Sequence, residues 1–360
     1  MKLLKKRDEE MAKRKEMGTK NLIKMKKLEG YSKLVDSIGE LLGLARKQVA
    51  RIFNTILVET YWKIGERIVE YEQKGGEKAE YGTKLLTRLS KDLRLRHGKG
   101  FSKSNVYLMR SLYIKYPKFQ TLSGKLSWSH YGELLSITDD LARSFYEKQC
   151  IKENWSVREI KRQINSALFE RIALSKDKKG VLLLAKKGQV IEKEEDIIKD
   201  PYVLEFLKIP EKYRYTEKEL EQKLINNLQN FLLELGKGFA FVGRQYRITL
   251  NNTHFYVDLV FYHTILKCFV LVDLKVGKVT HQDAGQMNMY LNYFKAEVSA
   301  DNDSPPIGII LGAKKDNILV EYALGSISNK LFVSRYKLYL PNKKELTQRL
   351  RYSLESKNNK

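Results

Sequence analysis

The sequence predicts a multi-domain α/β protein in which an all-helical domain precedes a domain of order α-β-β-β-α-β with a mixed sheet. Three observations lead to this architecture. The chain has 360 residues, which suits two domains better than one. Apolar residues recur at helical spacing through the first half. Strand-like apolar runs, flanked by helical segments, follow in the second half.

The composition indicates a basic protein that is neither disordered nor embedded in a membrane. Hydrophobic residues make up 42% and charged residues 31%. Lys and Arg number 67 against 43 acids, a net charge of +24, which favours a polyanion partner, nucleic acid first. A generally lysine-rich composition is the alternative. The two cysteines lie far apart, and no signal peptide or membrane span is recognisable, so we expect a cytoplasmic location.

The first half predicts a basic extension followed by a helical domain. Residues 1–30 are highly charged and contain few large apolar residues, which is typical of a frayed or helical extension. Residues 31–174 show helical periodicity. One helical stripe of this region is formed by Ile38, Leu41, Leu42, Ala45, Val49, Ile52 and Ile56.

Two short amphipathic segments in this domain leave two interpretations open. "YGTKLLTRLSKDL" and "FSKSNVYLMRSLYIKY" are joined by the glycine-containing "RLRHGKG". As a helix-turn-helix, the second segment would present Lys103, Asn105 and Arg110 to a DNA groove. As a plain helix corner, it would have no such role. We therefore expect the domain to bind DNA or to dock a protein partner.

A change in composition separates the two domains. Residues 175–200 lose the periodicity and are rich in Lys, Glu and Gly, which predicts a linker. Residues 201–345 form the second domain, and residues 346–360 form a basic C-terminal tail. The first helix of the second domain, "TEKELEQKLINNLQNFLLELG", begins with a capping box of Thr216 and Glu219 and stops at Gly236.

Two predicted strands of the second domain carry charges inside apolar runs. The strand at 254–262 contains Asp258, and the strand at 267–275 contains Asp273 and Lys275 on one face. A hairpin that turns symmetrically about Ile265 and Leu266 places the two aspartates directly across from each other. Their Cβ atoms would then be about 4.5–5.5 Å apart.

Two facing carboxylates repel each other and are costly to bury unless a cation neutralises them. Hard oxygen ligands favour Mg²⁺ or Mn²⁺, which bind proteins through one or two carboxylates and add waters and substrate phosphate. Lys275, on the same face as Asp273, can reach a scissile phosphate or the attacking water. This combination suits phosphodiester hydrolysis. The alternative is a solvent-facing Asp-Lys pair on an exposed sheet.

Further polar residues flank this pair. Glu221, on the helix before the sheet, could add a third carboxylate. Gln286, early on the helix after the lysine strand, could turn a neutral polar group towards the site. Arg244 and Gln245, on the first strand, either contact backbone phosphate or form local hydrogen bonds. Each of these residues taken alone is an ordinary surface polar residue, so their joint order carries the prediction.

The order of Glu221, Asp258, Asp273, Lys275 and Gln286 over α-β-β-β-α resembles the PD-(D/E)xK nuclease superfamily, whose fold is restriction-endonuclease-like. The stretches "FYVDLVFYH", "VDLK" and "GQMNMYLNYF" look like the YhcG-type nucleases of bacteria, as do "YWKIGERI", "LSWSHYGELL" and "WSVREIKRQINSALFERI" in the first half. The resemblance covers roughly residues 31–340. It implies that Asp258 and Asp273 hold the metal with Glu221, that Lys275 serves the phosphate and the nucleophile, and that Gln286 supports them.

The resemblance implies a metal-dependent endonuclease that hydrolyses phosphodiester bonds in DNA. Val257 stands where the superfamily pattern has proline, and Asp273 is shorter than the glutamate that relatives often carry. A metal shifted by about 1 Å can cost roughly a hundredfold in rate. The alternative is therefore a catalytically weak or inactive DNA-binding or scaffold protein with the nuclease fold, acting with restriction, repair or defence partners. Cutting two strands with one site per chain favours a homodimer.

Overall fold

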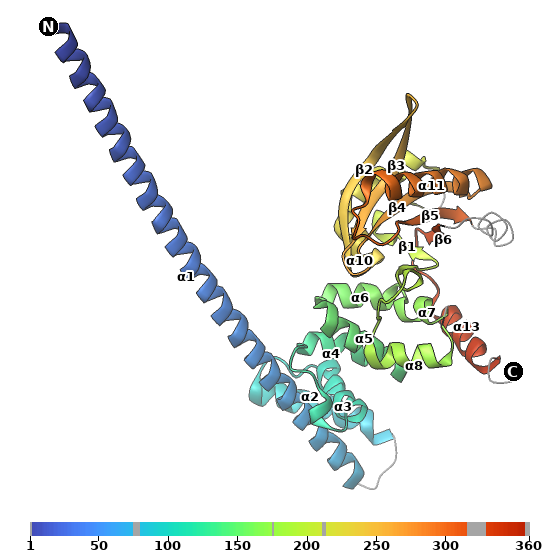
Figure 1. Cartoon of the computed structure of the whole chain (residues 1–360). Helices are drawn as coiled ribbons and strands as arrows, with labels where there is room; N and C mark the ends of the chain where they lie inside the picture. Colours follow the sequence, from blue (N-terminus) through green and yellow to red (C-terminus); the bar gives the residue numbers. More distant parts are fainter. Residues whose placement is uncertain (1, 75–79, 175, 211–213, 315–328, 357–360) are drawn as a thin grey trace. The chain divides into compact units, whose positions relative to one another are not determined.

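The computed structural model describes residues 2–74, 80–174, 176–210, 214–314 and 329–356 (Figure 1). The chain divides into two compact units, Met1–Tyr131 and Gly132–Lys360. No helix in these described ranges is long and apolar enough to cross a membrane.

The first unit is helical, as predicted. Its helices α2 and α3 pack beside the C-terminal part of α1 (Figure 1). The packing buries Ile68 of α1, Leu86 of α2 and Val106 of α3. Ser102 caps α3 by accepting a hydrogen bond from the Asn105 amide at 3.2 Å. The elements are α1 (Lys2–Lys74), α2 (Glu80–His97), α3 (Lys103–Lys115), η1 (Phe119–Thr121) and α4 (Trp128–Leu135), the last crossing into the second unit.

The apolar stripe predicted from the sequence lies on α1, N-terminal to this packed region. The helix is present, but the large side chains of the stripe are exposed to water, from 48% at Ile38 to 67% at Val49. The change occurs near Val58, which is 4% exposed. The stripe is therefore not part of the core of the first unit.

The second unit begins with a layer of short helices. They are α5 (Asp140–Glu153), α6 (Val157–Asn165), α7 (Leu168–Ala173), α8 (Lys178–Lys187), η2 (Glu194–Ile197) and η3 (Glu205–Leu207). The helix α8 lies where the sequence predicts a linker, and it buries Val181, Leu184 and Ala185. The lysines that suggested a linker lie on a short helix that packs apolar side chains inward, so this segment is not an extended connection.

The predicted order α-β-β-β-α-β and the mixed sheet are both present in the second unit. The strands lie in the order β1-β6-β5-β4-β3-β2. Strands β2, β3 and β4 pair antiparallel, whereas β4, β5, β6 and β1 pair parallel. The strands are β1 (Tyr202–Val203), β2 (Phe239–Leu250), β3 (Thr253–His263), β4 (Cys268–Lys278), β5 (Ile307–Lys314) and β6 (Lys330–Lys337).

Helices cover both faces of this sheet. On one face, Leu220 and Phe231 from the preceding helices pack with Phe261 and Val272. On the other face, Met287 and Leu291 of the following helix pack with Leu271. The helices on the sheet are α9 (Glu217–Asn226), α10 (Leu228–Leu235) and α11 (His281–Tyr293) with the π-helical turn η4 (Phe294–Val298). A further helix, α13 (Lys343–Ser356), packs beside α7 (Figure 1). The predicted helix from Thr216 is broken into two at Asn227.

A buried ionic cluster joins the short helices to the sheet. The Glu234 side chain is fully buried and accepts hydrogen bonds from Arg171 at 2.6 Å and from the Val203 amide at 2.9 Å. Arg162 lies 3.3 Å from the same carboxylate. Burial acts to raise the pKa of Glu234, but Arg171, Lys199 and Arg162 outweigh it and hold this pKa below its usual value.

Glu234→Gln tests the weight of this cluster. Removing the carboxylate leaves the fully buried Arg171 and Lys199 without their counter-charge, so we expect a loss of about 3–5 kcal/mol in the free energy of unfolding. Urea denaturation followed by circular dichroism measures it. The matched control is Glu195→Gln, from an exposed ion pair of the same unit, with an expected change within about 0.5 kcal/mol. Equal losses in the two variants would contradict this account.

Candidate active site

Strands β3 and β4 pair in the predicted register. The ladder runs from His263–Cys268 beside the turn to Leu259–Val272, symmetrically about Ile265 and Leu266. Asp258 and Asp273 are the next residue of each strand beyond the last pair. The hairpin therefore brings the two aspartates to the same level of the sheet. Each of them lies one residue beyond the end of the paired region, Asp258 on β3 and Asp273 on β4.

Asp258 is held by hydrogen bonds to both carboxylate oxygens. Its Oδ2 accepts from the Leu274 backbone amide at 2.8 Å, which ties it to β4 one residue beyond Asp273. Its Oδ1 accepts from Gln245 Nε2 at 3.0 Å. Because each contact uses one lone pair, both oxygens keep acceptor capacity for a further ligand.

The Gln245 amide also bridges Asp258 to Glu221. Its Nε2 donates to Glu221 Oε2 at 2.8 Å, so one NH₂ group joins the two carboxylates. Gln245 lies on β2 but has φ +46°, a left-handed conformation that is unfavourable for a residue other than glycine. The sequence leaves two roles open for Gln245, a contact with backbone phosphate or local hydrogen bonds. In the structure Gln245 forms local hydrogen bonds. Burial is the main cause that raises the pKa of Glu221.

Asp273 is the most buried carboxylate of the pair, with 4% of its surface exposed. Burial, and then the charge of Asp258, raise the pKa of Asp273 to about 7, although Lys275 acts to lower it. Lys275 Nζ lies 3.2 Å from Asp273 Oδ2 and 3.4 Å from Asp283 Oδ1. Burial acts to lower the pKa of Lys275, but Asp273, Glu217 and Asp283 outweigh it, so this pKa is raised and the ammonium stays charged.

Gln286 reaches the site through a tyrosine rather than directly. Its Nε2 donates to the Tyr290 hydroxyl, which in turn donates to the Tyr256 carbonyl at 3.1 Å. Burial, and then the Asp273 charge, raise the pKa of Tyr290. Gln286 thus orients a neighbour of the aspartates.

The three carboxylates do not converge on one point. Among the described residues, no group of three or more His, Cys, Asp or Glu side chains is arranged to hold a metal ion. The Gln245 amide lies between Glu221 and Asp258 and donates to both. The expected ligand set of Asp258, Asp273 and Glu221 is thus not assembled as one group here. Asp258 borders a pocket of about 560 Å³, whose other lining residues are Glu217, Lys218, Glu221, Gln222, Arg244 and Gln245. Asp273 and Lys275 are not among its lining residues.

The residues predicted to contact DNA are spread over the two units. Arg244 lines the pocket and donates from Nη1 to Gln222 Oε1 at 2.9 Å. In the first unit, Lys103 is exposed. Asn105 accepts from Trp128 Nε1 at 2.7 Å. Arg110 pairs with Glu72 at 2.7 Å. Asn105 and Arg110 thus stabilise the helix corner, whereas Lys103 and Arg244 are exposed.

Sequence reasoning missed three neighbours of Lys275. Asp283 lies 3.4 Å from its ammonium, Tyr290 lies near Asp273, and the Glu217 charge also acts on Lys275. Asp283 had a usable signal, because Thr280 and Asp283 form a capping box that starts α11 just after the lysine strand. Glu217 and Tyr290 gave no comparable signal, since their places depend on how α9 and α11 pack on the sheet.

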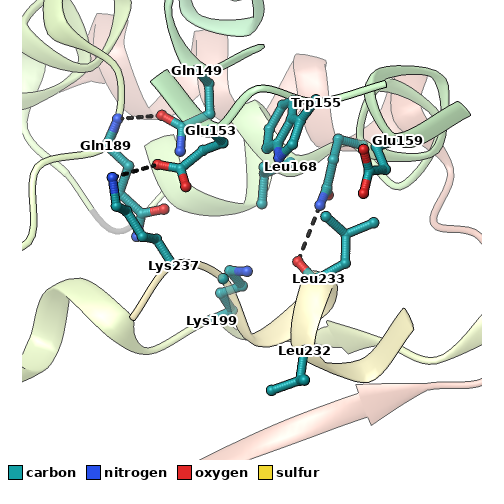
Figure 2. A pocket seen from close by; sticks show the side chains of 12 residues that line it. Gln149, Glu153, Trp155, Glu159, Leu168, Gln189, Lys199, Leu232, Leu233 and Lys237 are labelled. Atoms are coloured by element: carbon teal, nitrogen blue, oxygen red, sulfur yellow. Dashed lines mark hydrogen bonds and ion pairs between the residues drawn. The ribbon is translucent and has the colours of Figure 1, made fainter. Parts of the chain in front are cut away.

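A second pocket of the same unit, of about 180 Å³, lies apart from the carboxylates (Figure 2). Its polar side chains pair with one another or with the backbone, as Figure 2 shows for Gln149 with the Gln189 amide at 2.9 Å. Glu153 lies 3.8 Å from Lys237 in the same view. The buried Lys199 donates to the Glu234 carbonyl. None of the predicted site residues lines this pocket, and we assign it to the packing of the short helices.

Comparison with known proteins gives matches to both halves of the chain. Residues 195–351 match the family model of the YhcG PDDEXK nuclease domain, and residues 37–171 match that of the DUF1016 N-terminal domain. The Escherichia coli (strain K12) protein named "Putative nuclease YhcG" is 41% identical, over 89% of this chain and 94% of that protein. The resemblance inferred from the sequence motifs is thereby confirmed, together with the restriction-endonuclease-like class of the second domain.

Two solved structures also resemble part of the chain. A repair endonuclease from Pyrococcus abyssi is 20% identical with a TM-score of 0.26, over 37% of this chain and 50% of that one. EndoMS in its apo form is 14% identical with a TM-score of 0.24, over 36% and 49%. This chain thus spans about half of each, and at such scores neither structure supports a conclusion.

The raised pKa of Asp273 predicts a pH-dependent stability. The unfolded carboxyl titrates near 3.9, so the folded chain holds an extra proton between about pH 4 and 7. The stability that this proton contributes is complete below about pH 4 and is lost as the pH rises through 7. In EDTA, the unfolding free energy of the wild type should therefore fall relative to Asp273→Asn over this interval. The expected total is a few kcal/mol, since one pKa unit is about 1.4 kcal/mol.

Urea denaturation of both proteins at a series of pH values measures this difference. A constant difference between the two from pH 4 to 8 would show that the Asp273 carboxyl is not protonated in the folded state.

Proposed function

The chain belongs to the YhcG family of PDDEXK nucleases, and from that premise we propose that it is a Mg²⁺- or Mn²⁺-dependent endonuclease that hydrolyses phosphodiester bonds in DNA. One observation supports the proposal: Asp258 accepts from the Leu274 amide at 2.8 Å, one residue beyond Asp273, and the Lys275 ammonium lies 3.2 Å from Asp273. A pair of carboxylates next to an amine suits phosphodiester hydrolysis. The carboxylates can hold a divalent cation, and the amine supplies a fixed positive charge for the phosphate.

The aspartates fit a hard divalent cation. Both offer oxygen donors, and the burial that raises the pKa of Asp273 is the cost that a bound cation removes. Asp258 and Asp273 would hold the ion, with waters and substrate phosphate completing its shell. When bound, the cation would lower the pKa of a water and neutralise charge developing on the phosphate.

Lys275 acts in this proposal as a fixed charge rather than as a base. Its raised pKa keeps the ammonium protonated, so it donates hydrogen bonds to a phosphate oxygen or to the attacking water. Asp283 and Asp273 hold it from two sides. Glu221, fixed by Gln245, lies on the pocket side of Asp258 and orders water there.

The proposed substrate is DNA because the chain is strongly basic and basic side chains line the pocket beside Asp258. The net charge of +24 favours a polyanion. Arg244 and Lys218 line the pocket and supply positive charge at its wall. Lys103 of the first unit is a further candidate for a phosphate contact, made by the helical domain.

Asp273→Ala tests the catalytic role. Loss of this ligand should abolish Mg²⁺-dependent nicking or linearisation of plasmid DNA, while the thermal unfolding midpoint in EDTA stays the same or rises, since a buried charge is removed. The matched control, Asp301→Ala, removes an exposed acid from the turn before β5 and should cleave as the wild type does. Cleavage by Asp273→Ala at the wild-type rate would refute the site.

Lys275→Met tests the fixed charge. Removing one donor to a developing oxyanion typically costs about 10²–10³ in kcat, so single-turnover cleavage should slow by that factor. Binding of DNA in Ca²⁺ should weaken much less than the rate. Lys278→Met, farther along β4 and exposed, serves as the control for the loss of one positive charge. Equal effects of both variants would indicate that Lys275 contributes only general attraction for DNA.

A further inference from the structure

The described part of α1 carries a row of exposed apolar side chains that overlaps the predicted stripe, with Val35 added and Leu41 at its flank. Its six large aliphatic members are between 48% and 67% exposed, and they are Val35, Ile38, Leu42, Val49, Ile52 and Ile56. Isolated exposed aliphatic residues are ordinary, but a contiguous row of this length marks an interaction surface.

The row follows a heptad pattern rather than the pattern of a helix packed on a globular core. From Tyr31 to Ile56, apolar residues alternate at steps of four and three, with Ala45 filling the one small position. This is the 3.5-residue period that keeps a seam facing one partner helix. The next two seam positions are Glu59 and Lys63, which pair with each other at 2.8 Å, so the seam ends where the packed region of α1 begins.

We propose that this seam, residues 31–56 of α1, pairs with the same seam of a second copy of the chain in an antiparallel coiled coil. The sequence is self-complementary in that orientation. Val35 lies level with Ile52 of the other copy, Ile38 with Val49, and Leu42 with Ala45 at the centre. Each pair joins an a position of the heptad on one helix to a d position on the other, as antiparallel packing requires.

The charges along the seam favour this orientation. Asp36 and Glu40 lie in its N-terminal half with one basic residue, Lys33, whereas Arg46, Lys47 and Arg51 lie in its C-terminal half. Antiparallel pairing brings the acidic half of each helix level with the basic half of the other. Parallel pairing brings the three basic residues level with their own copies, which costs energy between like charges.

The area is sufficient for a stable dimer. If each large side chain of the seam and its flanks removes roughly 50–100 Å² from water, about ten of them remove on the order of 500–1,000 Å² per copy. Stable interfaces bury about 800 Å² per partner. Two flanking leucines, Leu34 and Leu41, are 55% and 65% exposed and widen the seam beyond the eight core positions.

Sedimentation velocity on the full chain tests the proposal without reference to cleavage, so its failure and the failure of the proposed nuclease function are separate results. We expect the wild type at micromolar concentration to sediment as a dimer. The double variant Leu42→Glu, Val49→Glu puts four charges into the seam of the dimer and should weaken association by at least about a hundredfold. Glutamate is a good helix former, so circular dichroism should stay unchanged.

Leu44→Glu is the matched control. Leu44 is 63% exposed on the same helix but lies off the seam, so this variant should remain a dimer. Three results would overturn the proposal: a monomeric wild type, which would mean that another partner or another part of this chain covers the seam; a dimer that survives the double variant; or equal loss of the dimer in both variants.

Disulfide trapping tests the orientation. Val35→Cys mixed with Ile52→Cys should form a cross-linked heterodimer, whereas each variant alone should not. Both native cysteines are buried, so they should not interfere. Cross-linking of each variant with itself, and not of the mixture, would establish a parallel pair and overturn the antiparallel proposal.

Discussion

The register of one antiparallel hairpin sets the geometry of the candidate active site. Side chains alternate along a strand, so a slip of one residue between β3 and β4 would carry one aspartate to the opposite face of the sheet. The observed ladder, from His263–Cys268 to Leu259–Val272, excludes that slip. Buried residues on both faces of these strands, such as Phe261 and Leu271, keep the register fixed. The hydrophobic core therefore determines where the charged groups meet.

Charge balance at the site follows from this placement. Asp273 is buried and Asp258 is partly buried, and the protein supplies a lysine, an amide and a backbone N–H around these two carboxylates. The left-handed Gln245 belongs to this balance, since its unfavourable backbone conformation delivers one NH₂ group to two acidic side chains. Strained residues are concentrated at functional sites in many proteins, because surrounding contacts can hold them there. Here the contacts that hold Gln245 are its hydrogen bonds to Glu221 and Asp258.

Local sequence signals were sufficient for much of the fold and the centre of the site. Alternation of apolar residues predicted β2, β3 and β4, and the symmetric turn about Ile265 and Leu266 predicted the register of the β3–β4 ladder, which ends one residue before Asp258 and Asp273. Features that depend on tertiary packing were not accessible in this way. The short strand β1 has only two residues, and the break at Asn227 lies inside an unbroken leucine pattern. Gln245 shows the same limit, because nothing in its sequence neighbourhood signals a positive φ.

The buried cluster around Glu234 has a consequence for dissecting the chain. The two family matches end and begin on either side of residues 172–194, which invites a cut there to obtain a minimal catalytic fragment. Such a fragment would retain Glu234 and Lys199 but lose Arg162 and Arg171, which lie on the discarded side. Its interior would then expose a surface that normally holds two guanidinium groups. A recombinant piece that starts near Gly132 would keep both arginines with Glu234. Poor solubility of the shorter piece would therefore say nothing about the stability of the full chain.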